Sequence, residues 1–305
     1  MNRNLIVLFF SQIFSFTAAP VTVFLSGIIG SQISPLKSLS TLPMSISVVG
    51  IALGAIVATK TMSLLGRRTG FIIAAISNSL VSLLAAYSVM SQNFILFCFA
   101  NFFIGVGMAF THQYRFAAAE SVDKEKIPKA ISIILLGGIV SAFIGPGTAN
   151  LTKNFLSEQL YVGSYVSLAV YMFLPAIFFL FYKNSTIEKK DISFIGRGYF
   201  EIISQPRFLQ AMVASAFGYA IMTFLMTATP ISMHINDNMS LNSTSFVIQL
   251  HIISMFLPAL VTGILIKKFG HSKIMYYGVL FFIITIFLSY LDQTVTNYLF
   301  SLIFL

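Results

Sequence analysis

Long runs of apolar residues recur along this chain of 305 residues, and each is long enough to cross a lipid bilayer as a helix. A helix needs about 20 apolar residues to cross the hydrocarbon core, because each residue adds about 1.5 Å of length. Short polar turns separate nine such runs. The predicted spans are residues 5–29, 39–65, 71–90, 94–118, 130–155, 162–182, 208–234, 243–266 and 274–290. The chain is therefore predicted to be an all-α integral membrane protein.

Charge content excludes a water-soluble fold. Only 9% of the residues are charged, against about 25% in soluble domains, so polar side chains could not cover a water-exposed surface. The single cysteine, Cys98, excludes an intramolecular disulfide. A tenth apolar run begins near Tyr298 and reaches Leu305, which is too short to span. We expect that this sequence stops inside a helix, as a fragment or as the product of a truncated gene.

The basic residues predict how the chain is oriented. With the N-terminus inside, 16 of the 18 Lys and Arg residues fall on the inner side, and only Lys37 and Lys153 fall outside. Inner loops of membrane proteins carry this excess of positive charge. The N-terminus is therefore predicted to be cytoplasmic, in the plasma membrane, which is the inner membrane of a bacterium. The same topology explains the net charge of +9 without a nucleic-acid partner.

Two features predict a chain built of two similar halves. The only long polar connection, residues 183–207, follows the sixth span and divides an N-terminal six-helix bundle, residues 1–182, from a C-terminal bundle, residues 208–305. Basic turns also recur after the second span of each half, at Gly66-Arg67-Arg68 and at Lys267-Lys268-Phe269-Gly270. Internal repeats of this kind are typical of secondary transporters.

These turns resemble the loop between helices two and three of the major facilitator superfamily, G-x-x-x-D-[RK]-x-G-[RK]-[RK]. Gly66, Arg67 and Arg68 match its end, although Ser63 stands at the acidic position. In the second half, Lys267 stands at the acidic position, before Lys268 and Gly270. The fourth span is similar to the family's R-x-x-x-G pattern at Asn101 to Gly105, and Gly145-Pro146 is similar to the glycine–proline element of the fifth.

The resemblance implies a two-bundle fold of six plus six helices, of which about nine and a half are present. It also implies alternating access, with the basic turns acting as gating loops, and we expect a monomer. A central site would be lined by the first, fourth, seventh and eighth spans.

His251 is the one titratable side chain clearly inside a span, so it is a candidate for proton coupling. A neutral histidine bonded between helices is the alternative. Ser254 and Pro258 share its face of the helix, whereas Gln249 faces elsewhere and is a separate candidate.

Other polar residues are candidates for contact with a solute. Arg115 could hold an anionic group or pair with an acid such as Glu120, or it could reach out to the lipid headgroups. For the rest, packing between helices is an equal alternative to solute contact. These further candidates are Asn101, Gln113, Tyr219 and Thr227.

Enzymatic motifs are missing from the sequence. There is no zinc-binding H-E-x-x-H, no G-x-S-x-G and no phosphate-binding G-x-x-x-x-G-K-[ST]. We therefore expect no cofactor and no metal, and a permease that moves a small solute and is driven by a gradient, as a symporter or antiporter, with H+ as one candidate ion. A non-transporting remnant and, less favoured, a membrane-embedded enzyme remain as alternatives.

Overall fold

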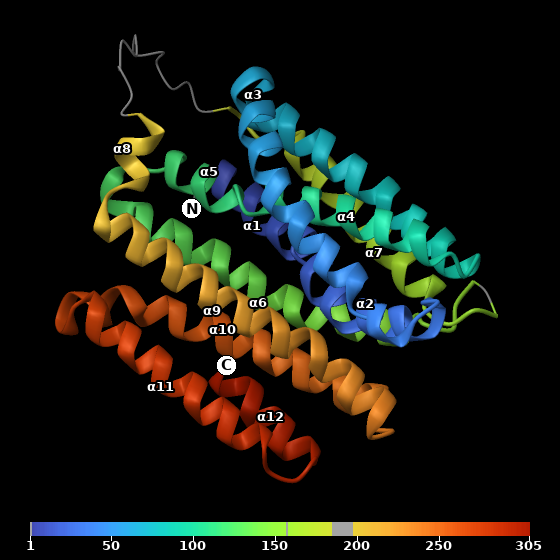
Figure 1. Ribbon diagram of the computed structural model, residues 1–305. Helices are drawn as coiled ribbons and strands as arrows, with labels where there is room; N and C mark the ends of the chain where they lie inside the picture. Colours follow the sequence, from blue (N-terminus) through green and yellow to red (C-terminus); the bar gives the residue numbers. More distant parts are fainter. Residues whose placement is uncertain (1, 157, 185–197) are drawn as a thin grey trace.

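The computed structural model describes residues 2–156, 158–184 and 198–305, and Figure 1 shows them as a bundle of long helices. The helices of the first part are α1 (Arg3–Ser15), α2 (Ala18–Ile33), η1 (Lys37–Leu39), α3 (Leu42–Met90), α4 (Phe94–Thr111), α5 (Tyr114–Glu120), η2 (Lys124–Lys126), α6 (Ile127–Leu151) and α7 (Val162–Phe179). Those of the second are α8 (Tyr199–Ile203), α9 (Pro206–Ile231), η3 (Ser232–Asn236), α10 (Leu241–Phe269), α11 (His271–Ser289) and α12 (Val295–Phe304).

Eight helical segments of the described chain are long and apolar enough to cross a membrane. The segment Lys37–Met90 has 54 residues and turns back at Gly66, so it holds two of the nine predicted spans. The short α12 begins at Val295, three residues before the predicted start of the tenth run. The predicted all-helical membrane class is confirmed.

Two predicted spans are broken within the structure. The span predicted at residues 5–29 is divided between α1 and α2 at Phe16 and Thr17. Pro20 lacks the N–H that the carbonyl of Phe16 would accept in a continuous helix, and the N–H of Ala19 bonds that carbonyl instead (3.1 Å). The span predicted at 94–118 is likewise divided between α4 and α5, at His112 and Gln113.

Glycines let the helices of the first part approach closely. A Cβ at Gly105 of α4 would lie 2.0 Å from the carbonyl oxygen of Ser47 on α3, and one at Gly50 would lie 2.1 Å from that of Phe102. Association in lipid relies on such close backbone packing, because lipid tails are as apolar as the side chains. Near Gly66, Phe71 lies with its ring centroid 4.8 Å from those of both Tyr114 and Phe179.

The basic turns place Gly66 and Gly270 in the same backbone conformation. Their φ and ψ angles are 79° and 161°, and 83° and 160°. Positive φ favours glycine, because it has no Cβ. We call the end of the molecule with these turns the basic end, and the opposite end, where α4 and α10 begin, the far end. The shared geometry agrees with the sequence repeat.

The predicted linker lies largely outside the described residues. Of residues 183–207, the structure describes 183–184 and 198–207, which include α8 and the start of α9 at Pro206. The division into an N-terminal bundle (1–182), a linker and a C-terminal bundle (208–305) stays a prediction. In the bundle of Figure 1 the two parts of the chain meet where α10 packs against α6 and α9 packs against α2.

Candidate functional site

A central cavity of about 380 Å³ lies between the two parts of the chain. Its lining comes from α1 to α6 on one side and from α9 and α10 on the other. Both broken spans contribute at their breaks, through Phe16 and His112. Broken helices and a site between the halves are features of transporter binding sites.

The lining is mostly apolar and aromatic. Phe16 and Phe256 contact each other across the two parts, edge to face, with ring centroids 5.3 Å apart. The ring of His112 stands 6.4 Å from that of Phe16, also edge-on. A Cβ at Gly138 would lie 2.9 Å from the ring of Phe256, so the absence of a side chain there leaves room for this ring. The methionines of the lining are Met44, Met108, Met222, Met226 and Met255.

Few polar groups reach this cavity. They are Gln12, Thr22, Thr111, His112, Arg115, Tyr219 and Thr223. Arg115 is the one Lys, Arg, Asp or Glu among the 22 described residues of the lining. Its side chain is exposed, and its guanidinium carbon lies 5.2 Å from the centroid of the Phe116 ring. An apolar pocket with a few polar groups is typical of a small-molecule site.

Of the predicted solute-contacting residues, the structure brings Arg115 and Tyr219 to the central cavity. Gln113 lies instead in a polar pocket at the basic end, with Arg67 and Glu120. Thr227 and Tyr219 share a third pocket, between α9 and the start of α3, and the hydroxyl of Thr227 donates to the carbonyl of Thr223 (2.6 Å).

Asn101 lies in a contact between helices. Its side chain is fully buried, accepts a hydrogen bond from Ser26 of α2 (3.0 Å) and donates to the carbonyl of Phe97 (2.8 Å). Gln249 of α10 donates to the carbonyl of Phe143 on α6 (3.2 Å). Neither residue lines the central cavity.

His251 faces α12. Its Nδ1 lies 2.6 Å from the carbonyl oxygen of Leu302, so this nitrogen carries the proton and donates. The ring is buried, and its Nε2 has no hydrogen-bond partner within the part of the chain that the structure describes. The predicted coupling role therefore stays a prediction, for a residue of α10 that faces α12 and does not line the central cavity.

The residues predicted to act as gating loops lie at the basic end, where those of the first turn are hydrogen-bonded. Arg67 donates twice to the carboxylate of Glu120, at 2.5 and 2.6 Å, so the acid suggested for Arg115 is held by Arg67. Arg68 donates to the carbonyls of Phe179 and Leu180 (3.2 and 2.8 Å). Lys267 and Lys268 of the second turn are exposed.

The glycine–proline element of α6 packs against α2. A Cβ at Gly145 would lie 3.1 Å from the ring of Pro20 and 3.2 Å from the carbonyl of Thr17. Pro146 stands inside α6 and removes one backbone donor there. The element therefore contacts the broken span at the wall of the central cavity.

Two contacts at the far end join the two parts of the chain. The Cβ of a residue in place of Gly27 on α2 would lie 2.9 Å from Ile231 at the end of α9. Asn150 of α6 donates a hydrogen bond to the side-chain oxygen of Asn242 on α10. We call these four residues the far-end contact.

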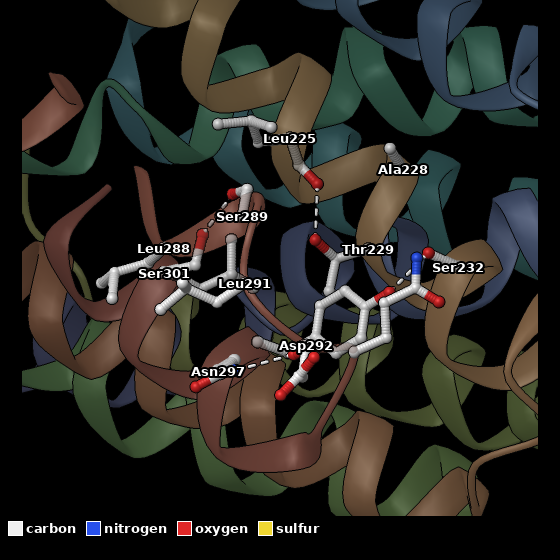
Figure 2. A pocket seen from close by; sticks show the side chains of 13 residues that line it. Leu225, Ala228, Thr229, Ser232, Leu288, Ser289, Leu291, Asp292, Asn297 and Ser301 are labelled. Atoms are coloured by element: carbon white, nitrogen blue, oxygen red, sulfur yellow. Dashed lines mark hydrogen bonds between the residues drawn. The ribbon is translucent and has the colours of Figure 1, made fainter. Parts of the chain in front are cut away.

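A smaller cavity, of about 200 Å³, lies among α9, α11 and α12 (Figure 2). Tyr298 donates there to the carboxylate of Asp237 (2.7 Å) and bonds the hydroxyl of Ser232 (2.6 Å). Asn297 donates to the carbonyl of Asp292 (2.7 Å). Because all of its described lining follows residue 224, this cavity is not shared between the two parts of the chain.

Sequence reasoning missed the aromatic and methionine lining. Phe16, Phe256 and the five methionines carry no distinguishing signal in a chain with 32 Phe and 13 Met. Pro20 is the sequence feature that indicates a break in this span, and the break places Phe16 in the cavity lining.

Comparison with known proteins gives the family. The family model of the Major Facilitator Superfamily matches residues 5–305. The riboflavin transporter RfnT of Brucella anthropi is 32% identical over 275 residues, covering 90% of this chain and 69% of that protein. The uncharacterized MFS-type transporters YddS and YdeG of Bacillus subtilis are 24% and 23% identical, over 89% of this chain each. The chain spans 65% and 66% of their lengths, about two thirds of these relatives.

Solved structures share the fold. A bacterial homolog of the human lysosomal transporter Spinster, inward-facing and occupied, matches 98% of this chain with a TM-score of 0.68 and 15% identity, over 70% of that chain. The nucleoside transporter NupG matches all of this chain with a TM-score of 0.63 and 16% identity, over 78% of its own. The resemblance inferred from the turns at Gly66 and Gly270 is confirmed, and the chain belongs to the major facilitator superfamily, a family of membrane transport proteins.

Proposed function

We propose that this protein carries a flavin, or a similar flat heteroaromatic solute, across the membrane by alternating access, with the central cavity as its binding site. The observation that carries the proposal is the cavity itself. Both parts of the chain line it, so a rocking motion between them would expose it to either side in turn. Its volume of about 380 Å³ lies in the range of small-molecule sites, about 300–1,000 Å³.

The lining suits a flat, weakly polar ring. Phe16 and Phe256 present aromatic faces and edges, and methionine side chains adapt to the outline of a ligand. The 32% identity to a riboflavin transporter supports a flavin as the first solute to test. A flavin combines a broad apolar ring with carbonyl oxygens and a polar chain, which matches a lining of this composition.

The protein would have the orientation and the location in the cell that its sequence predicts. The N-terminus and the basic end would face the cytoplasm, since basic loops stay inside, and the membrane would be the plasma membrane of a bacterium. The protein would work as a monomer, through a six-helix N-terminal bundle joined by residues 183–207 to the second bundle.

Proton coupling through His251 is the proposed source of energy. An ionisable side chain inside a membrane span is a candidate for moving protons, and the Nε2 of His251 has no hydrogen-bond partner among the described residues. Uptake driven by an imposed pH gradient, compared between wild type and His251→Ala, tests this part. Uptake that keeps its pH dependence in the variant would assign His251 to packing alone.

Uptake of labelled riboflavin tests the proposed function directly. Cells that cannot take up riboflavin would express the protein, with the empty vector as the control. We expect saturable uptake that excess unlabelled riboflavin suppresses. Uptake no higher than in the vector control, with the protein present in the membrane, would overturn the proposal.

A further inference from the structure

We infer that Arg115 is the specificity-determining residue of the central cavity, where its guanidinium donates to the carbonyl edge of a flat heteroaromatic substrate. This inference rests on the proposed function and assigns the contact that selects the substrate. Three observations carry it: the isolation of the charge, the partners of the nearby acid, and the aromatic wall beside it.

The charge of Arg115 is isolated within the cavity. The other described residues of the lining are neutral side chains or His112, so nothing there offsets a positive charge. No ion pair to Arg115 occurs among residues 2–156, 158–184 and 198–305. The side chain of Arg115 is exposed, so water and not a protein group satisfies its guanidinium. A ligand with acceptor oxygens would take the place of this water.

The nearest acid in sequence has another partner. Glu120 is one helical turn and a residue beyond Arg115, but Arg67 holds both of its carboxylate oxygens, at 2.5 and 2.6 Å. Arg115 instead has a contact to the ring of Phe116, with 5.2 Å between the guanidinium carbon and the centroid. The N–H groups of the guanidinium therefore remain for a ligand in the same cavity.

The aromatic groups place a ring within the same space. His112, three residues before Arg115, lies edge-on to Phe16, and Phe16 lies edge-on to Phe256. All four side chains line the one cavity. A substrate ring among them would direct its polar edge to Arg115, because no other charged group of the described lining competes for it.

An arginine suits this task better than a lysine. Its planar fork donates two parallel hydrogen bonds to adjacent acceptors, whereas the lysine ammonium is a point charge. Arg115→Lys therefore keeps the positive charge that orients the chain but removes the fork. A residue that served only as a topology charge would tolerate this change.

The experiment measures binding to the solubilised protein and uptake in cells, for wild type, Arg115→Lys and Arg115→Gln. Lys129→Gln is the matched control, because Lys129 is exposed near the start of α6 and does not line the cavity. The probes are riboflavin, flavin mononucleotide, lumichrome (the flavin ring with its carbonyls but without the chain) and phenazine (three fused rings without carbonyls). Surface expression of each variant is measured in parallel.

We expect Arg115→Lys to raise the KM for riboflavin and the Kd for lumichrome by about tenfold or more, as for the loss of a hydrogen bond to a charged group. Binding of phenazine should be unchanged, and Lys129→Gln should behave as wild type. Equal riboflavin and lumichrome affinities in wild type and Arg115→Lys would overturn the inference. A loss confined to flavin mononucleotide would overturn it too, because the contact would then be to the phosphate.

Failure of the proposed function has a different signature. A wild-type protein that neither takes up riboflavin nor binds lumichrome would overturn the proposed function and, with it, this inference. A wild-type protein that transports riboflavin, with Arg115 variants that do so equally well, would overturn the inference alone.

Discussion

Single residues decide how closely the helices of this protein approach one another. At Gly105 the backbone of α4 lies so near α3 that a methyl group would stand 2.0 Å from the carbonyl oxygen of Ser47. At Gly218 of α9, in contrast, no described atom beyond its chain neighbours and the backbone of its own helix lies within 4 Å of the place where a Cβ would be. A side chain larger than hydrogen therefore does not fit at Gly105 but does fit at Gly218.

Gly105→Ala should destabilise the protein by about 2 kcal/mol, because the added methyl group forces two backbones apart. Gly218→Ala is the matched control and should be neutral or slightly stabilising, since alanine favours a helix over glycine. The measurement is the temperature at which the solubilised protein loses its monodisperse peak. Equal melting temperatures for the two variants would contradict the close contact between α3 and α4.

Neighbouring side chains of this protein can face different pockets. Arg115 reaches the central cavity while Gln113, two residues away, faces a pocket at the basic end. Gln113 lies in the break between α4 and α5, whereas Arg115 lies in the first turn of α5. The predicted loss of riboflavin affinity in Arg115→Lys belongs to this scale.

At the scale of elements, α12 is held by hydrogen bonds to three neighbours. His251 of α10 bonds the carbonyl of Leu302, Ser289 of α11 bonds the hydroxyl of Ser301 (2.8 Å), and Tyr298 bonds Asp237 after η3. The bond from His251 to Leu302 is buried and joins α10 to α12, and hydrogen bonds of this kind help helices to associate in lipid.

His251→Ala should lower the stability of the protein by about 0.5–1.5 kcal/mol, because the hydrogen bond between α10 and α12 is lost. Ser254→Ala, one turn further along α10, is the control, because its hydroxyl bonds only the carbonyl of Leu250 in its own helix. Thermal melting of the solubilised variants gives the comparison. A His251→Ala variant as stable as Ser254→Ala would show that this bond does not hold α12.

The ion pair of Arg67 and Glu120 joins the turn of α3 to the end of α5. Their side chains are 21% and 34% exposed, so water weakens the pair and its coupling should be at most about 1 kcal/mol. A double-mutant cycle with Arg67→Ala and Glu120→Ala measures this coupling through melting temperatures. A coupling well above about 1 kcal/mol would contradict this limit.

The pair of Lys126 and Asp123 is a control for that cycle. Both side chains are 69% exposed, and the hydrogen bond from Lys126 holds the pKa of the Asp123 carboxyl below its usual range. We expect Lys126→Ala to leave the melting temperature unchanged, because pairs exposed to this extent contribute little to stability.

At the scale of the whole molecule, the two parts of the chain meet at the far-end contact. Alternating access requires this contact to open, since the central cavity must reach both sides in turn. Gly27 faces Ile231, and Asn150 bonds Asn242, so α2 and α6 of the first part contact α9 and α10 of the second.

Cross-linking cysteines at positions 150 and 242 should abolish uptake, because the contact could no longer open. The pair would be made as Asn150→Cys with Asn242→Cys in a Cys98→Ser background and joined by a short, reducible thiol reagent. Reduction should restore uptake, and each single cysteine variant should be unaffected by the reagent. Normal uptake by fully cross-linked protein would exclude opening at this contact.

The spans, the membrane class and the family could be predicted from the sequence, for physical reasons that act locally. A run of about 20 apolar residues needs no knowledge of its neighbours to be assigned to lipid. The turns at Gly66 and Gly270 are similarly local, because positive φ and adjacent basic residues are properties of a few positions. The two spans predicted on either side of Gly66 are both present in α3, which turns back at this glycine.

The tertiary structure alone decided which residues face the central cavity. In a soluble helix the polar face marks the outside, but here the lipid-facing and cavity-facing sides are both apolar, so the sequence carries no such mark. Asn101 and His251, which their polarity makes candidates for a site, form hydrogen bonds between helices. Phe16 and Phe256 line the cavity. Packing between distant helices sets these directions, because each polar group in lipid must find a partner within the protein.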